Sequence, residues 1–139
     1  MVNEELRKKI ADAGYENSIV YDDPSFDNSI IGVDVNGKTV YLYPLMALEY
    51  VEDDFEYAKN EYEGNLDDYT NDTLSEAYEF IDYNTVRATP YMGSLAPVII
   101  DYNQETETWY NLINGEDYNI EDIDFDIKLN ELEIYKEQI

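Results

Sequence analysis

The fold is decided by Ile30–Tyr43, which has the sequence IIGVDVNGKTVYLY. Two runs rich in β-branched and aromatic residues flank the dipeptide Asn36-Gly37. Such runs are typical of strands, and Asn-Gly between them favours a tight hairpin turn. The sequence therefore predicts two antiparallel strands joined by a type I′ turn.

The segment before this hairpin predicts a short helix and a short strand. The helix begins after Asn3 and ends at Gly14, with basic residues at positions 7–9 that complement the helix dipole. Ser18–Tyr21 is β-rich and is followed by an Asp-Asp-Pro turn, so we expect a strand there.

The segment after the hairpin predicts a helix that begins at Pro44, a residue suited to the first helical position. One stripe of this helix is apolar and consists of Leu45, Leu48, Val51, Phe55 and Ala58. The opposite stripe is almost uniformly acidic and consists of Glu49, Glu52, Asp53, Glu56, Asn60 and Glu63. Like charges at this spacing destabilise a helix slightly, so the acidic stripe is not explained by helix formation.

The second half of the chain predicts one more helix and three more strands. Thr73 and Glu76 form a capping box before a helix that ends near Asn84, with Leu74, Ala77, Tyr78 and Ile81 buried. After an irregular stretch at 85–97, Val98–Ile100 is predicted to pair with 107–112. Apolar and acidic residues alternate over 122–129, which predicts a strand with one acidic face, while 131–139 is left open between strand and helix. We therefore expect a single compact α+β domain over residues 1–139, with a mainly antiparallel sheet, the Asn-Gly hairpin and two to three helices.

The composition limits the chemistry that the chain can perform. Its 139 residues include no Cys and no His, which excludes disulfides, thiolate nucleophiles, Cys/His zinc sites and imidazole bases. The 44% hydrophobic content is sufficient for a packed core. No stretch approaches the ~18 consecutive apolar residues of a membrane helix, and positions 1–10 lack the apolar block of a signal peptide. We expect neither anchor nor signal peptide.

Charge is the most unusual property of the sequence. The chain has 33 acidic and 8 basic residues, a formal net charge of −25 at pH 7. Residues 49–82 hold 13 acids and one base, and residues 101–126 hold 9 acids and no base. A surface of this kind repels polyanions, so we expect neither nucleic acid nor membrane as a direct partner. Solubility alone needs a net charge of only about 2 to 8 in magnitude.

The magnitude of this charge matches a short DNA duplex. B-DNA carries one charge per ~1.7 Å of axis, so 25 charges correspond to about 42 Å of duplex. A compact domain of this length has a diameter of about 35 to 40 Å. The sequence therefore points to a protein that presents carboxylates in place of phosphates.

Two acid-based alternatives stay open at this stage. Asp122, Asp124, Asp126 and Glu133 have the spacing of a calcium loop, but Ile127 stands where that loop needs Gly. Paired carboxylates would also suit a hydrolase, although many such pairs arise by chance among 33 acids. Arg87 is expected to pair with Asp82 or with helix-end carbonyls.

Two resemblances extend these inferences. Ser29–Tyr43, Glu76–Gly93 and Ala96–Ile100 resemble small proteins encoded by phages and prophages of low-GC Gram-positive bacteria; within them the block DYNTVRATPY covers residues 82–91. The overall charge resembles that of phage anti-restriction and anti-CRISPR DNA mimics. These resemblances imply an inhibitor without enzymatic activity, cofactor or metal, acting in the cytoplasm of the infected bacterial host.

The implied partner is a basic DNA-binding protein of that host, with a type II CRISPR effector nuclease as the first candidate. A restriction enzyme, a nucleoid protein, a polymerase subunit or a role in phage structure is the alternative, beside the hydrolase and calcium-binding functions. The expected contact residues lie in two acidic segments and comprise Glu49, Glu52, Asp53, Asp54, Glu56, Glu61, Glu63, Asp67, Asp68, Asp122, Asp124 and Asp126.

Overall fold

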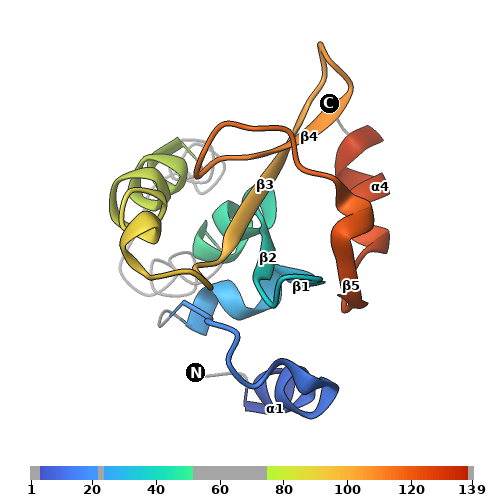
Figure 1. The fold of residues 1–139 in the computed structure, drawn as a ribbon. Coiled ribbons are helices and arrows are strands. Elements are labelled where there is room, and N and C mark those ends of the chain that lie inside the picture. Colours follow the sequence, from blue (N-terminus) through green and yellow to red (C-terminus); the bar gives the residue numbers. More distant parts are fainter. Residues whose placement is uncertain (1–3, 22–23, 52–74, 138–139) are drawn as a thin grey trace.

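The computed structural model describes residues 4–21, 24–51 and 75–137. Its centre is a five-stranded sheet with the strand order β4-β3-β2-β1-β5. In Figure 1 this sheet separates the yellow-green helix that ends near residue 86 from the red helix α4. The α+β class and the mostly antiparallel sheet predicted from the sequence are confirmed.

The elements follow one another along the chain without a regular strand-helix alternation. The strands are β1 (Ile30–Asp34), β2 (Thr39–Leu42), β3 (Val98–Asn103), β4 (Thr108–Asn111) and β5 (Ile123–Asp126). The α-helices are α1 (Glu4–Ile10), helix 43–51, helix 75–81 and α4 (Asn130–Glu137). Shorter helical turns cover Ala11–Tyr15, Pro24–Ser29, Asp82–Val86, Thr89–Tyr91 and Ile120–Asp122.

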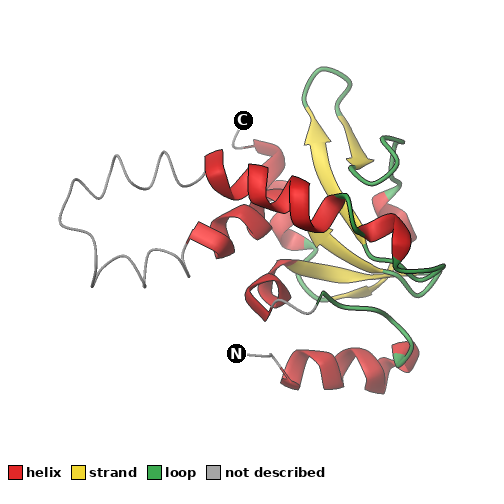
Figure 2. Cartoon of the chain, turned by 90° about the vertical axis from the view of Figure 1, so that its left-hand side faces the viewer, coloured by secondary structure: helices red, strands yellow, loops and turns green. Residues whose placement is uncertain are grey.

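The pairing of β2 with β3 is the one parallel contact among the described strands. Parallel neighbours need a long crossover, and the chain between them contains helices 43–51 and 75–81. Figure 2 shows these two helices side by side on one side of the sheet. The other described strand pairs are antiparallel, including β1 with β2 and β3 with β4 as expected.

The turn between β1 and β2 differs from the predicted type I′ geometry. That turn needs a positive φ at both central residues, whereas Gly37 has a φ of +82° and Asn36 has no positive φ. The Asp34 side chain accepts hydrogen bonds from the backbone N–H groups of Asn36 and Lys38, both at 3.0 Å. A three-residue loop with a left-handed glycine therefore replaces the two-residue turn, because Asp34 itself stabilises the longer loop.

The sheet is covered on both faces, which gives two hydrophobic clusters. One cluster joins Ile81 of helix 75–81 and Ala47 of helix 43–51 to Tyr41 of β2. The other joins Leu132 of α4 to Trp109 of β4. Every residue of β1 and β2 is buried, as expected for central strands with two covered faces.

Gly32 in β1 allows β5 to pair closely with this central strand. A Cβ at this position would lie 2.5 Å from Cγ2 of Ile123 and 2.5 Å from the backbone oxygen of Phe125. No larger residue fits there without displacing β5. The acidic strand β5 is thus positioned by a glycine on its neighbour.

Three details of the predicted elements are wrong. Ser18–Tyr21 is not a strand, because side-chain hydrogen bonds replace the ladder: Thr39 Oγ1 donates to the Ile19 carbonyl and the Tyr21 N–H donates to the Tyr41 hydroxyl. Leu48 is 45% exposed, while its neighbours Met46 and Ala47 are fully buried. The described residues form four α-helices rather than two to three, since the open C-terminal segment forms α4.

Candidate functional site

Almost all described carboxylates face solvent. Asp27 and Asp34 are the buried ones among the residues that the structure describes. Between described residues one ion pair forms, from Arg7 to Asp27. Most of the negative charge of the described part is therefore not neutralised within the fold.

The two buried carboxylates have structural partners. Asp27 accepts hydrogen bonds from Arg7 Nη2 at 3.1 Å and Arg7 Nε at 3.3 Å, which ties α1 to the turn before β1. Asp34 accepts the two N–H groups of its turn and the Tyr118 hydroxyl, the latter at 3.1 Å. Both carboxylates are held by the fold and are not available to a partner.

The structure places Asp122, Asp124 and Asp126 at one edge of the sheet. We call these three residues the β5 edge. All three are exposed, while Ile123 between them is buried and Phe125 is half-buried. The Tyr15 hydroxyl donates to the Asp124 carboxylate. The alternation of acidic and apolar residues correctly predicted that these carboxylates point to solvent.

The β5 edge has no geometry that would hold a metal ion. No group of three or more Asp, Glu, His or Cys suited to a metal occurs among the described residues. Asp126 Oδ1 instead accepts the backbone N–H of Leu129 at 3.0 Å and leads the chain into α4. The calcium-loop spacing is explained by a strand followed by a helix.

The opposite edge of the sheet is also acidic. Glu105 and Glu107 are exposed in the turn between β3 and β4, and Glu116 and Asp117 are exposed in the loop that pairs with β4. In the sequence these residues belong to the acidic run 101–126, and no feature of the sequence distinguishes them from their neighbours. Their alignment beside β4 comes from the Asn111 N–H, which donates to the Glu116 carbonyl at 2.8 Å.

Most of the first predicted acidic segment lies outside the described residues. This applies to eight of its members: Glu52, Asp53, Asp54, Glu56, Glu61, Glu63, Asp67 and Asp68. Glu49 is described and is half-buried on helix 43–51. The predicted contact role of this segment stays a prediction.

A cluster of tyrosine and carboxylate groups lies where helix 75–81 meets the sheet. The Tyr43 hydroxyl donates to Asp82 Oδ1 at 2.7 Å, and the Tyr43 and Tyr78 rings are 4.7 Å apart. Burial, followed by the hydrogen bond to Asp82, raises the pKa of Tyr43 far above its ordinary value. Burial also raises the pKa of Asp101 on β3, opposite Tyr110 of β4.

This cluster has the groups of an acid-base site. Burial disfavours the charged form of the Asp101 carboxyl and so raises its pKa, and the exposed Asp82 belongs to the same cluster around Tyr43. Neither carboxylate lines the cavities at Tyr21, Arg7 and Gly14. The contacts of Tyr43 with Tyr78 and Asp82 join helix 75–81 and its following turn to the first residue of helix 43–51.

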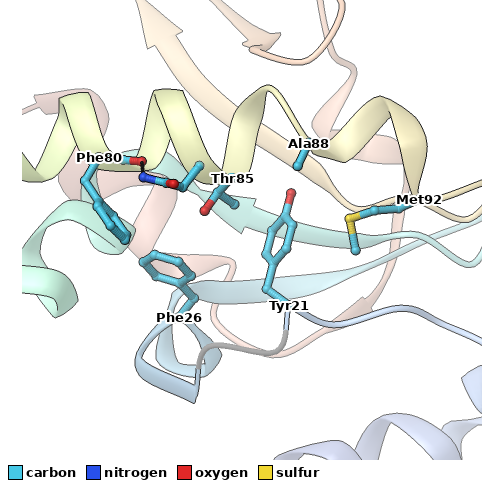
Figure 3. Close-up of a pocket in the computed structure, with 7 residues that line it drawn as sticks. Tyr21, Phe26, Phe80, Thr85, Ala88 and Met92 are labelled. Atoms are coloured by element: carbon cyan, nitrogen blue, oxygen red, sulfur yellow. Dashed lines mark hydrogen bonds between the residues drawn. The ribbon is translucent and has the colours of Figure 1, made fainter.

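A hollow lined by aromatic and aliphatic side chains opens between helix 75–81 with its following turn and the segment before β1 (Figure 3). We call it the aromatic pocket; it has a volume of about 240 Å³ and is lined by Tyr21, Phe26, Phe80, Asn84, Thr85, Ala88 and Met92. Tyr21 and Phe26 are buried and form its floor, while Phe80 is 40% exposed at its rim. The Tyr21 hydroxyl hydrogen-bonds Thr89, and burial raises the pKa of Tyr21 to about 12, so this group is a neutral part of the wall.

Exposed aromatic residues continue beside the pocket. Tyr83 and Tyr91 are 69% and 89% exposed. The Arg87 guanidinium lies 5.0 Å from the centre of the Tyr83 ring. The expected ion pair from Arg87 to Asp82 does not form; the aromatic ring takes the place of the carboxylate as the partner of the cation.

No family model, curated protein or solved structure matches this chain. In the described part of the chain no helix has the length and apolar character required to cross a membrane. The acidic edges and the aromatic pocket are the features of the described structure that bear on function.

Proposed function

We propose that this chain is a phage-encoded DNA mimic that inhibits a DNA-binding defence protein of the bacterial host. Its first candidate target is the DNA-binding channel of a type II RNA-guided CRISPR nuclease. In this proposal the carboxylates occupy the positions that the phosphates of target DNA would take. The chain acts by binding and carries out no reaction.

One observation carries the proposal: exposed carboxylates stand at both edges of an ordered sheet and form no ion pairs with other described residues. Asp27 is the one described carboxylate in an ion pair between described residues. A protein that needed charge only for solubility would intersperse Lys and Arg among its acids. Here such residues are scarce over the whole chain, with 8 basic against 33 acidic.

The geometry of β5 supports the same idea. Asp124 and Asp126 are two residues apart on a strand, so their backbones are separated by about 6.6 to 6.8 Å along the strand. Phosphates on one strand of B-DNA rise about 3.4 Å per nucleotide. Neighbouring carboxylates of the strand thus match every second phosphate along the duplex axis.

A nuclease of this class offers a suitable cationic surface. It reads a short DNA motif through Arg side chains in the major groove and holds nucleic acid in a positively charged channel. Carboxylates can form the same charge-assisted hydrogen bonds with Arg and Lys that phosphates form. Restriction enzymes and nucleoid proteins also bind DNA through cations, and they are the second class of target.

Competition for a DNA duplex tests the proposal. The guide-loaded nuclease is incubated with a fluorescent target duplex, and this chain is added at about 0.05 and 0.5 M salt, where the screening length differs several-fold. We expect displacement of the duplex at low salt and much weaker displacement at high salt. Added Ca²⁺ should leave the result and the melting temperature unchanged.

The outcomes of this experiment distinguish charge mimicry from other binding modes and the first candidate target from the second class. Binding that is equal at both salt concentrations would contradict mimicry by exposed charge. No displacement at low salt would exclude this nuclease as the target, and the same assay with a restriction endonuclease and a nucleoid protein then tests the second class. Failure with all three would overturn the proposed function.

A further inference from the structure

The aromatic pocket is shaped to receive a side chain from outside. Its floor is fixed, since Tyr21 is 6% and Phe26 is 2% exposed. In Figure 3 the two phenylalanine rings face one another at one end, and Ala88 and Met92 lie at the other. The Asn84 side chain donates to the Phe80 carbonyl at 3.0 Å, so this backbone acceptor beside the pocket is already engaged.

The volume of the pocket selects a particular size of occupant. A buried apolar cavity of about 150 Å³ accepts benzene, and sites for drug-sized molecules occupy roughly 300 to 1,000 Å³. The pocket, at about 240 Å³, lies between the two. It therefore fits one aromatic or long aliphatic side chain better than a complete small-molecule ligand.

The surroundings of the pocket have the composition of a protein interface. Tyr83, Arg87 and Tyr91 are all exposed beside it, and exposed tyrosine and arginine are the residue types that dominate interface energetics. Residues 82–86 form a π-helical turn, in which the Arg87 N–H donates to the Asp82 carbonyl. Such turns occur frequently at functional sites, because they alter the direction of the side chains that follow.

The charge near the pocket selects the partner. Glu76 lies one helical turn before Phe80, Glu79 lies one turn before Tyr83, and both carboxylates are exposed. Arg87, at the other end of this surface, is held over the Tyr83 ring. Positive groups of a partner are therefore attracted to the end at Glu76 and Glu79 and repelled from the end at Arg87.

We propose that the aromatic pocket binds one apolar side chain of a cationic protein segment, whose Lys or Arg residues pair with Glu76 and Glu79. This inference rests on the proposed function only in that the partner is cationic. It adds a contact that exposed charge does not provide, because burial of an apolar side chain does not weaken with salt.

Peptide binding tests this inference on the full chain. The probes are a peptide with a central phenylalanine between three lysines on each side, its counterpart with a central alanine, and a third peptide in which glutamates replace the lysines. The ¹³C-labelled methyl groups of Met92 and Ala88 report on the pocket, and that of the buried Met46 is the internal control. We expect the phenylalanine-lysine peptide to shift both pocket methyls and to bind at least tenfold more tightly than the alanine-lysine peptide.

Variants of two exposed alanines connect this preference to the pocket. Ala88→Leu fills the hollow and should abolish the tenfold preference, whereas Ala13→Leu, on the turn after α1, should preserve it. If Ala88→Leu does not fold by circular dichroism, Phe80→Ala removes the rim and should abolish the preference instead.

The outcomes separate this inference from the proposed function. Equal affinity of the two lysine peptides with no methyl shift would overturn the pocket as a docking site and leave the acidic surface intact. Binding of the glutamate peptide as tight as that of its lysine counterpart would overturn the cationic partner. Methyl shifts that depend on protein concentration alone would identify a second copy as the occupant and would also overturn the proposal. Failure of both lysine peptides to bind would count against this inference, while duplex displacement independently tests the proposed function.

Discussion

Neutralising the β5 edge tests whether these three aspartates contact the partner. The variant combines Asp122→Asn, Asp124→Asn and Asp126→Asn and changes the net charge from −25 to −22. Asparagine retains a side-chain oxygen, so the bonds that Asp124 accepts from Tyr15 and Asp126 accepts from the Leu129 N–H persist. We expect the melting temperature to change little, because exposed substitutions usually alter stability by less than about 0.5 kcal/mol.

The loss of affinity can be bounded from the exposure of the three side chains. Exposed ion pairs contribute about 0.2 to 1 kcal/mol each, so three of them contribute about 0.6 to 3 kcal/mol. Each 1.4 kcal/mol corresponds to about a tenfold change in Kd. The triple variant should therefore bind its target about 3-fold to 150-fold more weakly at low salt, chiefly through a slower association rate.

The matched control removes the same charge elsewhere. Glu4→Gln, Glu5→Gln and Asp12→Asn lie on α1 and the turn after it, and all three side chains are exposed. Association and dissociation rates of parent, variant and control are measured with the target immobilised at about 0.05 and 0.15 M salt. Equal losses for variant and control would show that only total charge matters, and unchanged binding of the β5 variant would refute the assignment of this edge.

Three further predictions concern stability and are checked by chemical or thermal unfolding. Burial raises the pKa of Asp101, so the stability from its protonated form is present at low pH and lost as pH rises through that pKa. Asp101→Asn should consequently be more stable than the parent at pH 7 and equal to it at low pH, whereas Glu105→Gln in the exposed turn should show no such trend; a pH-independent difference would contradict this. Gly32→Ala should cost about 1 to 3 kcal/mol by displacing β5 and should accelerate amide exchange in that strand, and unaltered exchange would be inconsistent with the close approach. Ile81→Ala should cost about 2 to 5 kcal/mol because the side chain is fully buried, while Tyr83→Ala, 69% exposed, should cost much less.

The sequence was informative wherever local pattern and tertiary environment agree. The β-rich runs around Asn36-Gly37 predicted β1 and β2, and the alternation over 122–129 predicted β5 with its exposed acids. Ser18–Tyr21 has the same β-rich composition but no strand forms, because its polar groups bond to side chains such as that of Tyr41. Which backbone groups a neighbouring strand will satisfy depends on tertiary contacts that local composition does not contain.

Helical periodicity failed at Leu48 for a related reason. A single apolar stripe assumes that a helix packs against one surface. Helix 43–51 instead contacts both clusters, with Met46 in one and Leu45 against the other, so the buried arc is shifted and Leu48 faces outward. Two separate cores cannot be inferred from one helical repeat.

The aromatic pocket could not have been predicted from the sequence. Tyr21 and Phe26 precede the first strand, whereas Phe80 and Met92 lie within the crossover that joins β2 to β3. The available signal was Tyr83 and Arg87, two exposed residues four positions apart. From the sequence, only Arg87 was singled out, as a residue expected to form an ion pair.

The exposed carboxylates and the aromatic pocket would contribute in different ways to binding of one partner. Exposed carboxylates accelerate encounter with any cationic surface, and they do so for many wrong partners as well as for the right one. A filled apolar pocket slows dissociation and distinguishes partners by shape, because only a segment with an anchor of the right size gains from it. Raising the salt concentration weakens the contribution of the carboxylates and leaves the contribution of the apolar pocket unchanged. Binding that persists at about 0.5 M salt in the parent but disappears in Ala88→Leu would thus measure how much of the recognition comes from the pocket and how much from the acidic edges.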